Sequence, residues 1–581
     1  MKFSNVIKGF FNDCKIEDHH SFFLESELAT PNYLNFNQLI SWPPNIFLIL
    51  NAVIDYTDKY RLLVSPQSHF KWDKLKKEKT SEIKDFWVDY LKHQQKKGAS
   101  SQFIPGELKK HIDIIFNPTS FDCNIYDLMN DVEFCESAFI MIIAIDRLFV
   151  RGINGKFDDI LELALIKRTL KIEFNKKSGP SNIQVDKENF ADNLLMNGIV
   201  TQKFNTPQSG LTMNNLSQNL AFVKPSVKYE LVSNKRVAFN ASHDSYNILI
   251  IPWPFIIKDG FFTPSKFDVP AYNMDEYFDF FDYEPDDDFT LEHFLSYVFS
   301  ALKRCGDIDL IVFPECSLSR EKTELLASTL FELFGDRSPS ILSGVYGKCD
   351  SIGENYALLK FISDTGDNFN EIKQSKHHRW FLNREQLRNY NLSISLDPNK
   401  KWWENISVDR RQLTVLKAGK GLTLCPLICE DLARQEPVAQ AVRSIGPNLV
   451  VSLLLDGPQI SPRWPGKYAA VLADDPGSSV LSVTALGMTQ RSTGLGYPPS
   501  FEVALWSEPG KPSESLKVTS YTGAVVLELR VERVKMWSID GRCEEKPVLR
   551  RETHTTIDLD SPLEQLAILK ENIKKSLSNR R

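Results

Sequence analysis

Two reactive side chains follow apolar segments that predict buried strands, each at the point where the strand should end. Residues 308–313 (IDLIVF) are followed by Pro314 and Glu315, and residues 422–428 (LTLCPLI) are followed by Cys429. Active sites of layered α/β proteins collect along the carboxyl edge of the sheet, where loops can vary without disturbing the core. A carboxylate and a thiol at one such edge could act as general base and nucleophile.

The Cys429 thiol needs activation before it can attack a carbonyl or nitrile carbon. At a strand-to-helix turn the positive potential of the helix N-terminus favours the thiolate, although Glu430 and Asp431 partly oppose it. Glu315 could supply the base, and Lys376 in the segment SKHHRW could supply a cation. A lone cysteine on an apolar strand is often an ordinary small hydrophobic residue. Taken alone, Cys429 is therefore equally compatible with an inert, buried thiol.

The ordered combination of three motifs narrows the choice. FPE after one strand, KHH further on and ICED after another strand resemble the Glu-Lys-Cys set of the nitrilase superfamily of carbon–nitrogen hydrolases. The resemblance covers roughly half of the chain. It implies Glu315 as the general base, Lys376 as the stabiliser of the tetrahedral intermediate and Cys429 as the covalent nucleophile. KHH is the least specific of the motifs, and Lys373 is an alternative for the lysine role.

The same resemblance implies further catalytic groups. Members of the family often carry a second glutamate in the loop after the lysine, and Glu385 is the candidate; a surface glutamate paired with Arg384 or Arg388 is the alternative. Lys376 and the backbone N–H of Glu430 would face the developing oxyanion, an interaction whose loss typically costs about 3 kcal/mol. The set uses no metal ion and no cofactor, so neither is expected.

The segment at residues 456–464 (DGPQISPRW) should line the substrate entrance in a protein of this family. Arg463 and Trp464 are therefore candidate substrate contacts, with simple loop packing as the alternative. Residues 470–476 read AVLADDP where the family carries an Arg-Ala-x-Glu-Asn-like signature. This departure bears on the pocket or a subunit contact more than on the chemistry.

Apolar strands that alternate with helices predict the elements that must position these residues. Residues 246–253 (YNILIIPW) and 449–455 (LVVSLLL) are typical of buried strands, and the strand-helix-strand order predicts a mixed α/β class. The resemblance implies a four-layer α-β-β-α sandwich, assigned to residues 236–545. Residues 546–581 are expected to form a C-terminal extension with a terminal helix.

The first part of the chain follows a different pattern. Residues 1–235 favour a mainly α-helical N-terminal domain, with apolar positions at helical spacing in residues 81–95 and 132–149. A loop-rich link is expected at about residues 178–218, where Gly, Pro, Asn, Ser and Gln dominate. Such a module suggests regulation by a protein partner, an effector or self-assembly.

Composition limits the classes of partner. The net charge of −6 and the pI near 6.0 give no overall attraction to nucleic acid. The nine scattered cysteines without a CxxC pair predict reduced thiols and no zinc site. The longest apolar run, residues 139–145, stops well short of the roughly 20 residues of a membrane-spanning helix, and no signal-peptide pattern opens the sequence. A cytoplasmic protein without a membrane partner is expected.

Three functions remain open within these limits. Amide hydrolysis is favoured over true nitrile hydrolysis, because most branches that resemble the motifs act on amides. A catalytically silent scaffold for ligand binding or assembly is the rival from another class. The expected partners are a small-molecule amide or nitrile substrate and further copies of the chain in a homo-oligomer.

Overall fold

The computed structural model describes residues 1–11, 36–66, 70–97, 104–150, 189–193, 197–224, 227–234, 245–265, 278–286, 288–408, 411–418 and 421–558. The chain divides into two compact units. Unit 1 comprises Met1–Pro225, Gln440–Gly446 and Lys535–Lys546, and unit 2 comprises Ser226–Ala439, Pro447–Val534 and Pro547–Arg581. Each unit is therefore assembled from three segments that are not adjacent in the sequence.

Unit 1 is built on helices that share one apolar core. The helices described in unit 1 are α1 (Phe3–Phe10), α2 (Phe36–Ile40), α3 (Pro43–Tyr56), α4 (Lys74–Lys97), α5 (Gly106–Ile115), α6 (Ile125–Asn130) and α7 (Val132–Leu148), which contribute to this core, and α12 (Gln440–Ile445), which contacts β2. The side chain of Asp131 caps α7 by accepting a hydrogen bond from the Phe134 N–H. A helix that is apolar on all sides, as α7 is between residues 139 and 145, has to be buried. The helices expected at residues 81–95 and 132–149 are confirmed by α4 and α7. No helix in the described part of the chain combines the length and apolar character needed to cross a bilayer.

A buried carboxylate on α7 organises the rest of unit 1. Asp146 is 1% exposed and accepts hydrogen bonds from the backbone N–H groups of Gln218, Asn219 and Leu220, each at 2.9 Å. It also pairs with the guanidinium of Arg542 at 2.6 Å. Leu220 opens the short strand β2 (Leu220–Val223), which pairs antiparallel with β1 (Ile199–Gln202). One charge thus connects a helix, a strand and the segment that contains Arg542.

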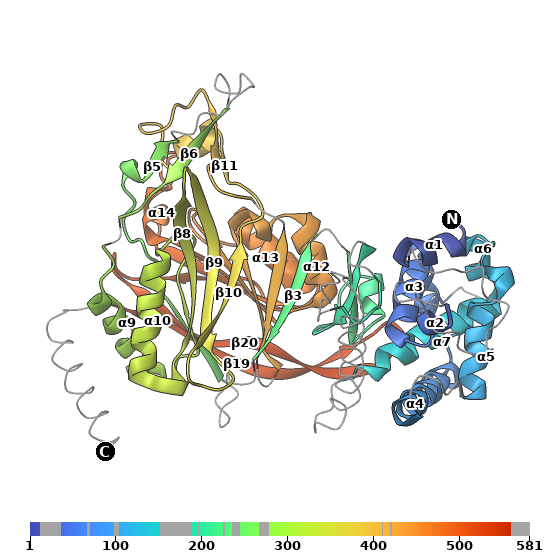
Figure 1. Ribbon diagram of the computed structural model, residues 1–581. Coiled ribbons are helices and arrows are strands. Elements are labelled where there is room, and N and C mark those ends of the chain that lie inside the picture. The colour runs from blue at the N-terminus through green and yellow to red at the C-terminus, as the bar shows by residue number, and fades with distance from the viewer. Residues whose placement is uncertain are drawn as a thin grey trace, which may run out of the picture. The chain divides into compact units, whose positions relative to one another are not determined.

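Unit 2 contains two sheets of seven strands each (Figure 1). The first has the order β10-β9-β8-β7-β4-β19-β20, with bounds Phe369–Ser375, Ile352–Ile362, Ser340–Cys349, Leu310–Val312, Ser245–Ile250, Ala524–Trp537 and Cys543–Ile557. The second has the order β18-β17-β16-β15-β14-β13-β3, with bounds Glu514–Lys517, Glu502–Ser507, Ser479–Thr484, Leu449–Leu454, Thr423–Ile428, Gln412–Lys417 and Lys228–Ser233. A smaller sheet has the order β11-β12-β6-β5, with bounds Phe381–Leu382, Lys401–Glu404, Phe278–Tyr283 and Phe262–Pro264.

Alternation along the central strands explains how the layers of unit 2 pack. Ile248 of β4 lies in a core that also holds Leu424 of β14, so the two large sheets share one apolar interface. Its neighbour Leu249 faces a second core with Phe294 of α9 (Leu291–Cys305) and Leu326 of α10 (Arg320–Phe334). Helix α13 (Trp464–Asp474) packs against β16 and β17 of the other large sheet. The mixed α/β class expected from the sequence is therefore observed.

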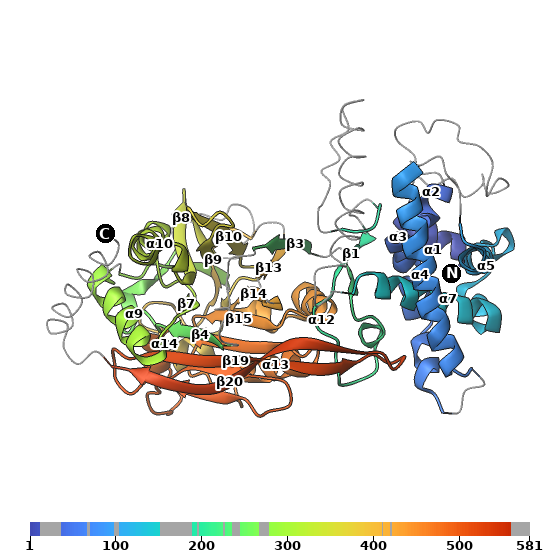
Figure 2. The same ribbon diagram turned by 90° about the horizontal axis from the view of Figure 1, so that it is seen from below.

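The expected boundaries need correction. β3 precedes residue 235, yet it pairs parallel with β13 inside the second large sheet, so unit 2 begins at Ser226 rather than near 236. Residues after 546 are also not a simple extension, because β20 continues to Ile557 at the edge of the first sheet. Figure 2 shows β19 and β20 as two long neighbouring strands. The expected terminal helix lies outside the described residues.

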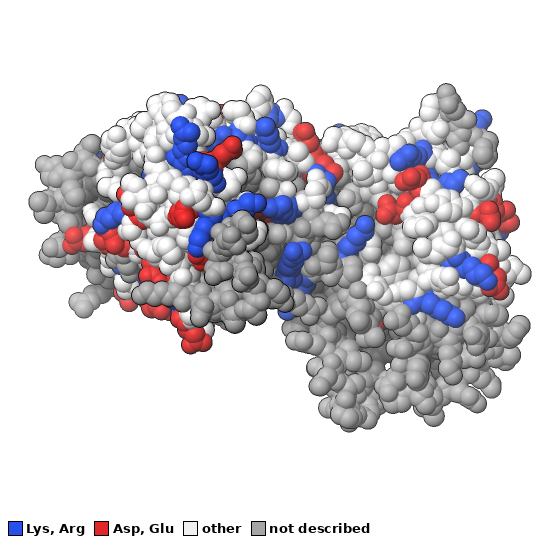
Figure 3. All heavy atoms as spheres, turned by 90° about the horizontal axis from the view of Figure 1, so that it is seen from above, with Lys and Arg blue, Asp and Glu red and all other residues white. Residues whose placement is uncertain are grey.

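Charged side chains of both signs are interspersed on the face of the molecule drawn in Figure 3. Exposed ion pairs of unit 2 include Lys348 with Glu284 at 2.9 Å and Arg320 with Glu371 at 2.9 Å. Such exposed pairs contribute little to stability.

Candidate active site

Three strand ends deliver the reactive residues expected from the sequence. Glu315 follows β7 through Phe313 and Pro314, Lys376 follows β10 directly, and Cys429 follows β14 directly. Their exposed fractions are 1%, 2% and 3%. β7 and β10 belong to the first large sheet and β14 to the second, so the shared interface of the two sheets is where these residues can meet.

The ammonium group of Lys376 lies between two carboxylates. Its Nζ donates to Oε1 of Glu315 at 2.7 Å and to Oε2 of Glu404 at 2.6 Å. Glu404 is the last residue of β12 in the small sheet, and its Oε2 also accepts the backbone N–H of Trp380 at 2.9 Å. The lysine is therefore held from both sides by fixed acceptors.

Asn355 of β9 joins the two carboxylates directly. Its Nδ2 donates to Oε1 of Glu315 at 2.7 Å and to Oε1 of Glu404 at 2.6 Å, while its backbone carbonyl accepts the N–H of Lys376 at 3.1 Å. The side chain of Asn355 thus sets the separation of the two carboxylates, and the backbone of the same residue positions Lys376.

The loop that carries Glu315 is fixed by close backbone packing. Gly344 of β8 donates its N–H to the Pro314 carbonyl at 3.1 Å and accepts the Ser317 N–H at 2.8 Å. A Cβ at Gly344 would lie 2.4 Å from the Glu315 Cα, so only glycine fits there. The second carboxylate oxygen of Glu315 accepts the backbone N–H of Leu455, after β15, at 2.8 Å.

Cys429 occupies a left-handed backbone conformation with φ of 44°. It begins a four-residue 3-10 turn, η9 (Cys429–Leu432), at the place where the sequence predicts a strand-to-helix turn. Non-glycine residues in this region store strain, and such positions cluster at functional sites. The turn ends β14 abruptly and leaves the thiol at the strand edge.

The surroundings of Cys429, its burial above all, favour the neutral thiol over the thiolate. Burial raises the pKa of Cys429 well above its ordinary value, Glu315, Asp456 and Glu404 add to this effect, and Lys376 opposes it. A thiol in this environment is not a preformed thiolate. A nucleophilic role for this thiol would require a base nearby to take its proton.

The two groups whose charges act most strongly on this thiol, Glu315 and Lys376, both have raised pKa values. Burial raises the pKa of Glu315, Lys376 opposes that effect, and Glu404 adds to it. Burial by itself would lower the pKa of Lys376, but the negative charges of Glu315, Glu404 and Cys429 outweigh it and raise this pKa well above its ordinary value. A carboxyl whose pKa is raised is a better general base near neutral pH than an ordinary glutamate.

Asp431 connects the cysteine turn to the lysine segment. This buried carboxylate of η9 accepts the backbone N–H of His377 at 3.0 Å and contacts Nδ1 of His378 at 2.8 Å. Lys376 precedes these residues immediately, so Asp431 ties the end of β14 to the end of β10. His377 is held in addition by Gln412, whose carbonyl lies 2.7 Å from Nε2.

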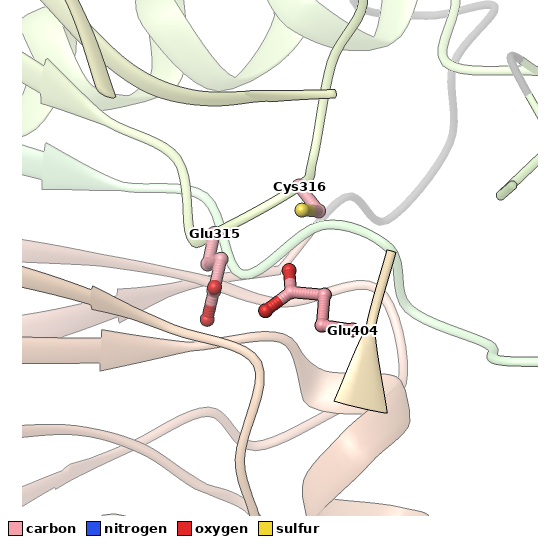
Figure 4. A group of neighbouring side chains, drawn as sticks. All are labelled: Glu315, Cys316 and Glu404. Carbon is pink, nitrogen blue, oxygen red and sulfur yellow. The ribbon is translucent and has the colours of Figure 1, made fainter. Parts of the chain in front are cut away.

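Potential metal-ligand atoms gather beside the lysine. Those of Glu315, Cys316 and Glu404 lie within 4.8 Å of one another, and Figure 4 shows the Glu404 carboxylate directed toward Glu315. The Lys376 ammonium already bonds both carboxylates at short range. It supplies the positive charge that a metal ion would otherwise bring, so these residues form an ion-pair cluster.

The second glutamate of the site differs from the one expected. Glu385 is exposed in the first turn of α11 (Arg384–Asn389), whereas Glu404 makes the contacts with Lys376. Nothing in the motif spacing pointed to Glu404, because it enters from another sheet. The available signal was an acidic residue at the end of a short aromatic segment, KWWE.

The remaining candidate residues lie around the same strand ends. Glu430 follows Cys429 and its carboxylate pairs with Arg434. Trp464 is half-buried and packs against the core between the large sheets. Arg463 donates to Oδ1 of Asp456 at 2.9 Å and to the Tyr390 hydroxyl at 3.3 Å. Asp456, the acid that Arg463 contacts, was not itself a predicted site residue; it is the first residue of the predicted substrate-entrance segment 456–464.

The sequence matches no protein-family model and no curated protein. Among solved structures, it is similar to Nit3 of Saccharomyces cerevisiae, a member of branch 10 of the nitrilase superfamily, with 13% identity over 49% of this chain and 90% of that one, at a TM-score of 0.30. A carbon-nitrogen hydrolase from Helicobacter pylori G27 has 10% identity over 56% and 94%, at 0.29. A glutamine-dependent NAD(+) synthetase from Cytophaga hutchinsonii has 9% identity over 49% and 42%, at 0.25. These TM-scores are too low to establish a shared fold, so the side chains of the site have to carry the functional interpretation.

Proposed function

We propose that unit 2 is a carbon–nitrogen hydrolase of the nitrilase type, with its two large sheets as the centre of an α-β-β-α sandwich, and that it acts as an amidase. The observation that carries the proposal is the position of the Lys376 ammonium, 2.7 Å from Glu315 and 2.6 Å from Glu404, where its charge acts on the buried thiol of Cys429. A structural core cysteine has no need of a buried base and a buried cation beside it.

The proposed reaction begins with proton transfer from the Cys429 thiol to the Glu315 carboxylate while sulfur attacks the amide carbon. Lys376 and the Glu430 backbone N–H stabilise the negative oxygen of the tetrahedral intermediate. Glu315 then gives its proton to the departing nitrogen, and the carbon–nitrogen bond breaks to leave a thioester. Water, deprotonated by Glu315, attacks the thioester, and release of the carboxylic acid restores the thiol.

Unit 1 is proposed to control this activity or the association of the chain with further copies. Its interlocked construction from three segments supports a role that depends on the whole chain rather than a detachable accessory. Nitrile hydrolysis and a silent scaffold remain outcomes of the test that follows.

Intact-mass analysis of the full chain with a small panel of activated amides tests the proposal. We expect an acyl adduct on Cys429 that disappears in Cys429→Ala and accumulates poorly in Glu315→Gln. Cys425→Ala is the matched control, because Cys425 lies on β14, the strand that ends just before Cys429, is fully buried and has a pKa raised by burial to about 12. Loss of the adduct in the Cys425 variant, or no adduct on the native protein, would support the scaffold instead.

A further inference from the structure

Asp456 is a buried acid whose place in the chain brings it to the edge of the site. It follows Leu455, whose N–H bonds the Glu315 carboxylate at 2.8 Å. The backbone of Asp456 is held by Thr484 at the end of β16. The Thr484 hydroxyl accepts a hydrogen bond from the Asp456 N–H at 3.0 Å and donates one to the Asp456 carbonyl at 2.5 Å. Its backbone position is therefore fixed by two neighbouring strand ends.

The two oxygens of the Asp456 carboxylate are used differently. Oδ1 accepts hydrogen bonds from the Tyr390 hydroxyl and from Arg463. The side chain is only 5% exposed. Its Oδ2 atom is buried and accepts no hydrogen bond from any residue that the structure describes. A buried carboxylate oxygen without a donor is unfavourable, so this atom is an acceptor that is ready for a ligand.

The partners of Oδ1 are themselves held in place, so the carboxylate cannot readily turn. Arg463 also donates to the Pro458 carbonyl at 3.0 Å. The Tyr390 carbonyl accepts Nε of Arg491 at 2.8 Å, and the same guanidinium reaches the Ile257 carbonyl at 2.8 Å. Since its guanidinium is committed to Asp456, Tyr390 and Pro458, Arg463 is poorly placed to bind a substrate carboxylate.

Asp456 also lies within electrostatic reach of the nucleophile. Its charge is among those that act on the Cys429 thiol, together with Glu315, Glu404 and Lys376. Together with Arg463, which pairs with Asp456 at 2.9 Å, these groups comprise three acidic and two basic side chains, so the negative charges remain in excess. An acyl group that carries negative charge would be repelled here, and one that carries positive charge would be attracted.

We propose that Oδ2 of Asp456 binds an ammonium or amino group on the acyl portion of the substrate, so that the preferred substrates are amides of amino acids rather than of plain or acidic carboxylic acids. This inference rests on the proposed amidase function, because it names the substrate class of the same site. Asp456 is then a specificity residue, and the Arg463–Tyr390 pair positions it.

Ligand binding to the full-length Cys429→Ala protein tests the inference without turnover. Calorimetry compares glycinamide, β-alaninamide and γ-aminobutyramide with propionamide, butyramide and pentanamide, in which a methyl group replaces the ammonium at each chain length. We expect at least one amino compound to bind about tenfold or more tightly than its methyl counterpart. Asp456→Asn, which keeps an acceptor for Tyr390 and Arg463, should remove that preference.

Asp350→Asn is the matched control, because Asp350 is exposed in the turn between β8 and β9 at φ of 55°, where asparagine is well tolerated. The preference should persist in this variant. A preference that is absent at every chain length, that favours succinamate, or that survives Asp456→Asn would overturn the inference.

Thioester formation on the native protein separates this inference from the proposed function. Thioesters at Cys429 without an amino preference would refute the role of Asp456 and leave the amidase standing. An amino preference in binding without any thioester would refute the amidase and leave the amine site standing.

Discussion

The Nζ atom of Lys376 lies 2.6 Å from Oε2 of Glu404, although Lys376 follows β10 and Glu404 ends β12, which are strands of different sheets. This contact holds the lysine independently of Glu315. In the proposed reaction Glu315 gains and loses a proton, so its attraction for Lys376 changes during each cycle. Glu404 can keep the ammonium in place while that happens.

Replacement of Glu404 by glutamine should therefore reduce kcat by about 100-fold, comparable to the loss of an oxyanion-stabilising group. The variant keeps an amide oxygen near Lys376 but removes the negative charge. Steady-state ammonia release measures the effect. Glu385→Gln is the control, because Glu385 is exposed on α11 and its loss should leave kcat near the native value. A larger loss at Glu385 than at Glu404 would contradict the assignment.

The pH dependence of kcat/KM should report Glu315. Burial raises its pKa, and the Asn355 hydrogen bond is among the effects that lower it. The base must be ionised, so activity should fall on acidification at a pH above the ordinary glutamate pKa of about 4.3. Asn355→Leu removes a contribution that lowers this pKa and should move the acid limb to higher pH. An unmoved limb, or one displaced to lower pH, would argue against Glu315 as the base.

Gly344 should tolerate no side chain. In Gly344→Ala the new Cβ would meet the Pro314 carbonyl at 2.3 Å and the Glu315 Cα at 2.4 Å, so the loop bearing the base has to shift. We expect kcat to fall by about 100-fold or more, since misplacement of about 1 Å can cost that much. Gly347→Ala on the same strand is the control, because its Cβ would come closest to the flexible end of Glu354, at 3.2 Å, and would otherwise make an ordinary contact with the Glu354 Cβ at 3.8 Å. Equal activities of the two variants would refute this reading.

The buried pair of Asp146 and Arg542 should dominate the stability of unit 1. Burial opposes the ionised form of Asp146, but Arg542 and the backbone N–H donors outweigh it and lower the pKa of this carboxyl. Its contribution is therefore present above the unfolded pKa of about 3.9 and is lost as the pH falls further. Asp146→Asn leaves the buried Arg542 guanidinium with Asp540, at 2.9 Å, as its remaining charge partner, and the loss of one charged acceptor should cost about 2–3 kcal/mol of unfolding free energy.

Chemical denaturation of the full chain, followed by tryptophan fluorescence, measures that loss. Asp122→Asn is the comparison, because the Asp122–Lys2 pair is largely exposed and its removal should change little. Equal losses in the two variants would show that burial of Asp146 is not what matters.

The sequence located the residues that follow the apolar strands β7 and β14 and missed those that arrive from other strands. Glu315 and Cys429 were predictable because a strand of the first or second sheet ends beside each. Glu404 was not, because β12 is short and belongs to the small sheet, so no spacing relates it to Lys376. Asn355 offered a usable signal, a polar side chain inside an apolar strand. The same rule that selected Glu315 also fits Asp456, which follows the apolar run of β15.

The boundary between the units could not be found by composition. A change of periodicity near residue 235 marks where helical patterning stops, but β3 already belongs to the second large sheet before that point. Residues Lys535–Lys546 belong to unit 1 although they comprise the end of β19, the start of β20 and the connection between these strands of the first sheet. Contacts between segments hundreds of residues apart leave no local trace in a sequence.

Because each unit is built from three separate segments of the chain, few truncated fragments can be expected to fold. The outer ends of β19 and β20 place Met536 and Ile539 in unit 1, where Met536 is 3% exposed and the Ile539 N–H bonds the Asn215 carbonyl at 3.0 Å. A fragment that starts after residue 235 would lose β3 and leave these apolar side chains without cover. Such a fragment should aggregate when expressed. A soluble fragment of unit 2 would have to begin at Ser226 and replace the tip between β19 and β20 with a tight turn.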